Sequence, residues 1–177
     1  MNPAWLVQTG RLVLSPVGWQ DLADLQALKG DSRVYGQMLG GVRNPGQVAA
    51  ELAQDIVFWA VRGVGMWLVR HEPGAAALGT TGLHERPDGR GIALRFAFCP
   101  EIRGHGLARE AAGAALRFAH DRARIERVVA VTREGNIASR TVLGAIGMRL
   151  CGTFDRDGSQ MLLFESLATP RADDAWR

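Results

Sequence analysis

The pattern with the clearest chemical meaning is the run Arg103-Gly104-His105-Gly106-Leu107-Ala108, which follows an apolar segment and Pro100 and precedes an alanine-rich segment. Two glycines at i and i+2 let backbone N–H groups crowd together, and a helix that begins here adds the positive end of its dipole. The run therefore predicts a cradle for an anion such as a phosphate. The alternative is a tight strand-to-helix turn that uses glycine for its backbone angles alone.

The two familiar phosphate-binding loops do not fit this run. A dinucleotide-binding Gly-x-Gly-x-x-Gly motif fails because Arg109 stands three places after Gly106, and no Gly-Lys-Ser/Thr follows as a P-loop requires. The identity of the anion therefore depends on the elements around the turn.

Hydrophobic periodicity predicts those elements. In the first half we expect an edge strand at 11–17, a helix with apolar residues at 19, 22, 25 and 28, a loop at 31–43, and a helix that Asn44 and Gln47 begin. Next come three strands of an antiparallel meander at 66–71, 77–86 and 92–99. The rest reads as a helix at 106–122, a strand at 127–132, a helix at 136–147, and a hairpin of 150–155 and 160–167 around Asp157-Gly158.

These elements predict one α/β or mixed α+β domain over residues 1–168, with a mobile tail at 169–177. The length of 177 residues, with 47% apolar and 22% charged content, suits a single globular core. We expect a mixed, mostly antiparallel sheet of about six to seven strands with about four helices on its faces.

Composition excludes several classes of protein. The net charge of +3 comes mostly from singly scattered arginines, and Lys29 is the only lysine, which argues against nucleic-acid binding. No apolar run is long enough for a membrane span, and the first ten residues lack the features of a signal peptide. Cys99 and Cys151 are expected to be free, buried thiols in a reducing cytoplasm, and no His, Cys, Asp or Glu spacing suggests a metal site.

Five motifs in order carry a resemblance. Arg103, Gly106 and Ala108 fill the signature [Arg/Gln]-x-x-Gly-x-[Gly/Ala] of the GNAT superfamily of acyl-CoA N-acyltransferases, which the chain resembles over nearly its whole length. It looks most like the Rim-type branch, which acetylates the N-terminal amines of ribosomal proteins. The further motifs are Arg11-Leu12-Val13-Leu14, Leu78-Gly79-Thr80-Thr81-Gly82-Leu83, Gly135-Asn136-Ile137-Ala138-Ser139-Arg140 and Gly147-Met148.

The resemblance implies a GNAT-like fold and an N-acetyltransferase. Acetyl-CoA would be the co-substrate, with no metal, and its acetyl group would pass directly to a primary amine, either a protein N-terminus or a small amine. A homodimer is compatible with this family. One alternative is a non-catalytic acyl-CoA-binding or sensing module on the same fold, and a weaker one is a nucleotide-phosphate binder of another fold.

The resemblance also assigns roles to residues. The backbone of Arg103, Gly104, His105, Gly106, Leu107 and Ala108 would hold the CoA pyrophosphate, with the His105 side chain in solvent. The strand that includes Ala97, Phe98 and Cys99 would pair with the pantetheine arm, and an N–H near Phe98 would stabilise the oxyanion. Asn136 would bind the pantetheine or act only as a helix N-cap, and Ser139 would protonate the departing thiolate or be a surface hydroxyl.

The chain departs from the family at the place of its usual catalytic glutamate, which falls at about Ala93, and at a usual glycine, which becomes Arg95. His84 is the best substitute for the base, against the alternative of a solvated strand end. Arg95 is expected to share the face of Ala93 and to bind a carboxylate of the acceptor. The acceptor would lie between the segment 33–43, where Tyr35 would contact it, and the segment 154–160.

Overall fold

A computed structural model describes residues 2–169, and its centre is one eight-stranded sheet with the order β1-β2-β3-β4-β5-β6-β8-β7. The strands are β1 (Val7–Gln8), β2 (Val13–Pro16), β3 (Met66–Arg70), β4 (Gly79–Glu85), β5 (Ile92–Phe98), β6 (Arg127–Arg133), β7 (Arg149–Arg156) and β8 (Ser159–Leu167). The α-helices are α1 (Leu22–Gly30), α2 (Ser32–Tyr35), α3 (Pro45–Arg62), α4 (Leu107–Arg117) and α5 (Ile137–Ala145). The expected mixed, mostly antiparallel sheet is confirmed.

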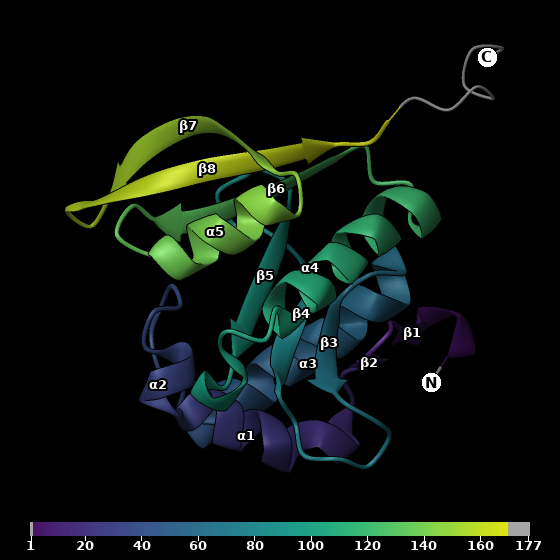
Figure 1. Cartoon of the computed structure of the whole chain (residues 1–177). Coiled ribbons are helices and arrows are strands. Elements are labelled where there is room, and N and C mark those ends of the chain that lie inside the picture. The colour runs from purple at the N-terminus through teal and green to yellow at the C-terminus, as the bar shows by residue number, and fades with distance from the viewer. Residues whose placement is uncertain (1, 170–177) are drawn as a thin grey trace, which may run out of the picture.

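The junction of β5 and β6 interrupts this antiparallel pattern. These two strands run parallel and pair only at Ala93 and Val129, whereas every other neighbouring pair in the described sheet is antiparallel. Beyond that single pair the strands diverge, as Figure 1 shows where β5 and β6 separate from a common region. The sheet is therefore split along the edge of β5 that faces β6.

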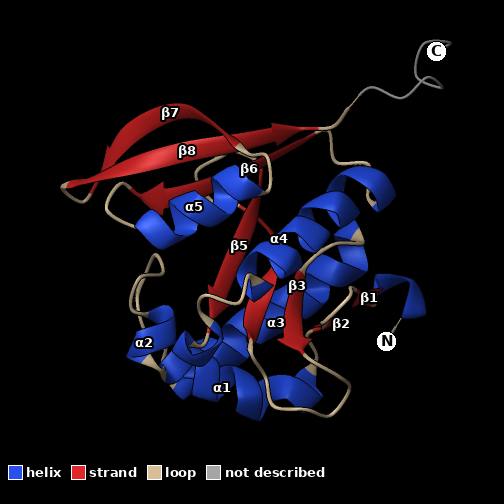
Figure 2. Ribbon diagram, viewed as in Figure 1, coloured by secondary structure: helices blue, strands red, loops and turns tan. Residues whose placement is uncertain are grey.

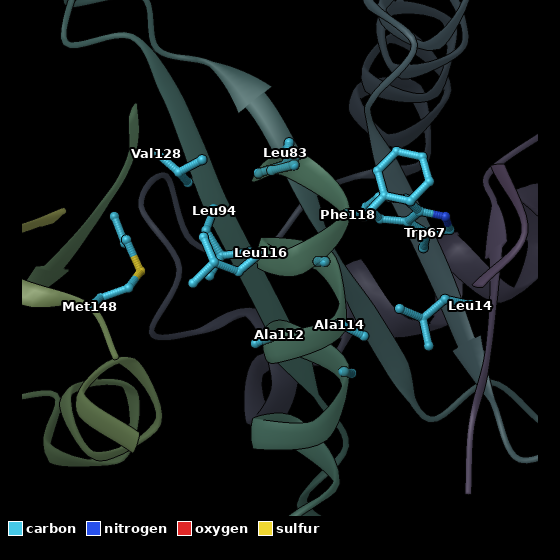
Figure 3. Packing of buried hydrophobic residues seen from close by; sticks show 14 of the residues in the cluster. Leu14, Trp67, Leu83, Leu94, Ala112, Ala114, Leu116, Phe118, Val128 and Met148 are labelled. Atoms are coloured by element: carbon cyan, nitrogen blue, oxygen red, sulfur yellow. The ribbon is translucent and has the colours of Figure 1, made fainter. Parts of the chain in front are cut away.

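Helices cover both faces of the sheet (Figure 2). On one face α4 lies across β4 and β5 and also contacts α5, which packs on β6. Three alanines of α4, at positions 111, 112 and 115, are fully buried, so this helix packs tightly on the sheet. Figure 3 shows Leu116 and Phe118 among the sheet residues Leu83, Leu94 and Trp67. On the other face α1 and α3 bury a second cluster that includes Ala97 of β5.

Local sequence signals explain the long helix α3. The Asn44 side-chain oxygen accepts a hydrogen bond from the Gln47 backbone amide, and the Gln47 side-chain oxygen accepts one from the Asn44 backbone amide, both at 2.9 Å. Gly63 ends the helix with a left-handed backbone at φ 64°. Between these caps Val48, Leu52 and Trp59 are buried and form the apolar stripe of the helix.

Several expected details are wrong. The strand at the start is not an edge, because β1 pairs with it, so the sheet has eight strands instead of six or seven. The expected loop contains the short helix α2, which brings the α-helices to five. Both cysteines are free, but Cys151 is exposed on β7 and Cys99 is only partly buried. The tail predicted at 169–177 lies, beyond Thr169, outside the described residues.

Candidate active site

The split in the sheet opens a cleft of about 620 Å³. Leu94, Arg95 and Phe96 of β5 form one wall, and residues 130–133 of β6 form the other. Residues 37–39 with Arg43, and residues 154–156 of the closing hairpin, complete the lining. The two segments expected to surround the acceptor therefore reach the same cleft.

The edge of β5 that faces this cleft carries unpaired backbone groups. The Cys99 amide donates to the Leu78 carbonyl at 2.9 Å, toward β4. Because backbone groups alternate in direction along an antiparallel strand, the N–H groups of Phe96 and Phe98 face the opposite edge. Pairing with β6 has already ended at Ala93, so this edge is open. Of the four residues predicted at 96–99, only Phe96 lines the cleft itself.

The glycine turn follows that open edge. Gly104 and Gly106 have positive φ angles of 81° and 72°, and Gly106 is the N-cap of α4. Within residues 2–169 no backbone acceptor pairs with the amides of residues 104–106, and the first amides of α4 have no partner inside the helix. These donors and the positive end of the α4 dipole are the features that the expected anion cradle requires.

The physical reason for the glycines differs from the one expected. A Cβ at Gly104 would meet no atom within 4 Å, so crowding does not exclude a side chain there. The left-handed backbone is the constraint, because only glycine adopts it readily. The turn is held by Arg11, which donates to the His105 carbonyl at 2.9 Å, and by Arg103, which donates to the Arg33 carbonyl at 3.1 Å. The His105 side chain itself is exposed, as expected.

Asn136 and Ser139 both line the cleft from the start of α5. The Asn136 side-chain oxygen accepts a hydrogen bond from the Ser139 amide at 3.1 Å, so its role as an N-cap is confirmed. The cap uses only the oxygen of the amide and leaves the nitrogen as a donor. Within the described chain the Ser139 hydroxyl makes no hydrogen bond, and it is partly exposed to the cleft.

His84 also lines the cleft, and the alternative of a solvated strand end is wrong. It pairs with Ala93 across β4 and β5, so the two side chains share one face of the sheet. Burial, and then the positive charges of Arg95 and Arg86, lower the pKa of His84 to about 4. Its Nδ1 atom is buried and has no hydrogen-bond partner among the residues described. His84 is therefore a neutral imidazole at pH 7.

Arg95 lines the cleft on the face of Ala93, as the alternation of β5 predicts. It is partly buried and makes no hydrogen bond or ion pair within residues 2–169. Sequence reasoning missed Asp55 on α3, the acidic group whose charge acts on both Arg95 and Lys29. Burial raises the pKa of Asp55 to about 6, against the opposing effect of these two cations. The signal in the sequence is the position of Asp55 beside the apolar stripe of α3, which indicates a partly buried carboxyl group.

Tyr35 does not reach the acceptor region. Its ring is 1% exposed and belongs to the core cluster beneath α1 and α3, with the Lys29 ammonium 6.0 Å from the ring centre. Its expected role in substrate binding is therefore replaced by packing. The neighbouring residues Gln37, Met38 and Leu39 reach the cleft instead.

Two further properties were searched over the described residues. Within 2–169 no group of three or more His, Cys, Asp or Glu side chains is arranged to hold a metal ion. No helix in that part of the chain has the length and apolar character to cross a membrane.

Comparison with known proteins identifies the family. Residues 11–149 match the model of an acetyltransferase (GNAT) domain. A Bordetella pertussis protein described as a GNAT-family acetyltransferase has a similar structure, with a TM-score of 0.79 at 23% identity over 90% of this chain and 98% of that one. A ribosomal-protein-S5-alanine acetyltransferase from Vibrio fischeri gives 0.78 at 14% identity, over 97% and 98%.

A third similar structure is RimL, a ribosomal L7/L12 α-N-protein acetyltransferase solved with coenzyme A, with a TM-score of 0.77 at 16% identity over 92% of this chain and 98% of that one. The neighbours thus include two ribosomal-protein acetyltransferases, the branch that the sequence motifs indicate. A nucleotide-phosphate binder of another fold, the weakest alternative, is wrong. The chain belongs to the GNAT acetyltransferase family.

Proposed function

We propose that this protein transfers the acetyl group of acetyl-CoA directly to a primary amine. The observation that carries the proposal is the path of unpaired backbone donors from the turn at 104–106 to the open edge of β5, where Phe96 lines the cleft. Such a path suits an extended molecule with an anionic end and a reactive end.

The cofactor binds through backbone groups in this account. The amides of residues 104–108 hold the pyrophosphate, and the open edge of β5 pairs with the pantetheine arm. The N–H groups of Phe98 and Phe96 lie two residues apart on that edge, about 7 Å along the strand. One of these two N–H groups stabilises the oxyanion of the thioester carbonyl. The N–H of Phe96 is the nearer candidate, because Phe96 lines the cleft wall.

The reaction needs few side chains because the thioester is already activated. The amine nitrogen attacks the carbonyl carbon, the C–S bond breaks, and the Ser139 hydroxyl donates a proton to the departing thiolate and takes one back from water. Asn136 positions the pantetheine with its free amide nitrogen. The amine proton leaves through His84 and water; with a pKa of about 4 the imidazole relays this proton and the solvent keeps it.

The alternative is an acyl-CoA-binding module without catalysis, and the absence of a carboxylate between Asp88 and Glu101 in the sequence favours it. The two functions separate in one assay. Release of CoA thiol from acetyl-CoA is measured with peptides, polyamines, amino acids and aminoglycosides as acceptors. Amine-dependent release, with the acetylated amine seen by mass spectrometry, supports the transferase. Tight acetyl-CoA binding with no release for any amine would overturn it.

A further inference from the structure

The cleft wall is unusually rich in arginine. Its lining contains six arginines and two aspartates. The arginines are Arg43, Arg86, Arg90, Arg95, Arg133 and Arg156. They come from four separate parts of the chain, so the accumulation is a property of the folded cleft and is invisible as a run in the sequence.

Most of these arginines are engaged by the protein itself. Arg86 and Arg90 share one carboxylate, Asp88, with ion pairs of 2.5 Å each, and this double contact holds the pKa of Asp88 far below its usual range. Arg43 pairs with Glu51, and Arg156 pairs with Asp157 at 3.5 Å. These ion pairs hold the arginine side chains in the cleft wall, so few of their N–H donors remain for a ligand.

Arg95 and Arg133 differ from the others. Within the described chain Arg95 has no hydrogen bond or ion pair, and Arg133 donates only to the Gln37 carbonyl, at 3.0 Å. Arg95 is on β5 and Arg133 on β6, so the two diverging strands each place at the cleft one cation that forms no ion pair.

No acidic side chain among the described residues forms an ion pair with either of these two cations. Asp55 lies on α3 near Arg95 but forms no ion pair with it. Burial of Asp55 disfavours the charged form of its carboxyl group. Asp155 lines the cleft from the hairpin and is exposed. A partly buried guanidinium with all its donors free gains most from a ligand that accepts in its plane, and a carboxylate does so with two parallel hydrogen bonds.

On the basis of the proposed function, we propose that the acceptor is a primary amine that carries a carboxylate, which Arg95 binds and Arg133 attracts. The carboxylate belongs to an amino acid or to the acidic start of a peptide. A cationic polyamine is disfavoured, because its second ammonium would lie in the positive field of the wall. Asp155 is the remaining acidic group at the cleft and suits the attacking amine before it loses its proton.

The test measures acceptor binding without turnover, so that it does not depend on catalysis. Protein saturated with CoA, which has no acetyl group to transfer, is titrated by calorimetry. The probes are L-glutamate, cadaverine, and the C-terminally amidated peptides Ala-Glu-Glu and Ala-Gln-Gln. We expect L-glutamate or the Glu peptide to bind more tightly than its uncharged or cationic counterpart. If L-glutamate has the higher affinity, the acceptor is an amino acid; if the Glu peptide has the higher affinity, the acceptor is a peptide.

Variants then identify the residue. Arg95→Leu should weaken binding of the carboxylate-bearing probe about thirtyfold. Arg95→Lys keeps the charge without the planar fork and should recover part of this loss. Arg149→Leu, an exposed arginine of β7 outside the cleft lining, is the matched control and should change nothing. Unchanged affinity for acetyl-CoA in each variant shows that it is folded.

Two results would overturn the inference: no binding of either carboxylate-bearing probe, or binding that is the same in Arg95→Leu as in the parent. A failure of the proposed function looks different. In that case the carboxylate-bearing probe still binds in an Arg95-dependent way, but no amine releases thiol from acetyl-CoA.

Discussion

In the proposed function, the cofactor and acceptor ends of the site bind their ligands by different means. At the cofactor end, the donors are backbone amides at 104–108 and along the open edge of β5. At the acceptor end, the polar groups belong to side chains, including Arg95, His84 and Asp155. A backbone site depends on φ angles and on strand pairing, whereas a side-chain site depends on which residues the fold brings together. Substitutions should therefore act in different ways at the two ends.

The largest effect is expected at the cofactor end. Gly106→Glu forces a side chain into a backbone with φ 72° and adds a negative charge where an anion binds. Affinity for acetyl-CoA should fall at least a hundredfold, about 3 kcal/mol, in titration calorimetry. Gly74→Glu is the matched control, because Gly74 also has a positive φ, of 81°, with open space around it, in the turn between β3 and β4. Equal affinity in the Gly106 variant and the parent would remove the anion site from this turn.

Between the two ends lies Ser139, where a single hydroxyl is expected to act in the chemical step. Ser139→Ala should reduce turnover roughly a hundredfold and leave the affinity for acetyl-CoA nearly unchanged, since the Asn136 cap bonds the backbone amide of residue 139. Thr141→Ala, on the same helix, removes an exposed hydroxyl that donates only to the Ile137 carbonyl. It should retain full turnover. If both alanine variants are fully active, Ser139 is a surface hydroxyl.

The smallest effect is expected at the acceptor end, and it concerns stability. The pKa of His84 is lowered from 6.5 to about 4 in the folded protein, so the unfolded chain binds a proton more readily. The contribution of the neutral imidazole is complete above pH 6.5 and is lost as the pH falls toward 4. Between pH 7.5 and 5 the loss amounts to about 2 kcal/mol of unfolding free energy.

Urea unfolding at the two pH values measures this loss. His84→Gln has no titrating group at this position, so its stability should fall by about 2 kcal/mol less than that of the parent over the same interval. Parallel pH dependence in the two proteins would mean that the imidazole is more solvated than its place in the cleft wall indicates. That result would weaken the account of the acceptor end, in which the fold buries the side chains that line the cleft.

The contrast also explains what could be predicted from the sequence. The anion turn and the caps of α3 rest on local signals, because Gly106 and Asn44 act within a few residues of themselves. The face shared by Ala93 and Arg95 follows from the alternation of one strand. The glycine turn before α4, the N-terminal cap of α3 and the shared face were predicted correctly from the residues, whereas the binding of an anion at the turn stays a prediction.

Features that depend on distant segments could not be predicted. Tyr35 stands in a glycine-rich segment that looked like a loop, and only the packing of α1 and α3 shows that its ring is buried. Asp55 becomes a group with a raised pKa because the packing of α3 buries it, and the charges of Lys29 and Arg95 oppose this rise. Likewise, β1 has only two residues and is recognised as a strand only because it pairs with β2. Such properties belong to the tertiary structure and leave no local pattern.

The central claim is that backbone amides hold the cofactor, and amide hydrogen exchange measures these groups directly. Exchange is followed by mass spectrometry with and without saturating acetyl-CoA. We predict slower exchange in peptides that cover residues 104–108 and 96–98, and unchanged exchange in the turn at 72–75. Binding of acetyl-CoA without protection at 104–108 would contradict the account.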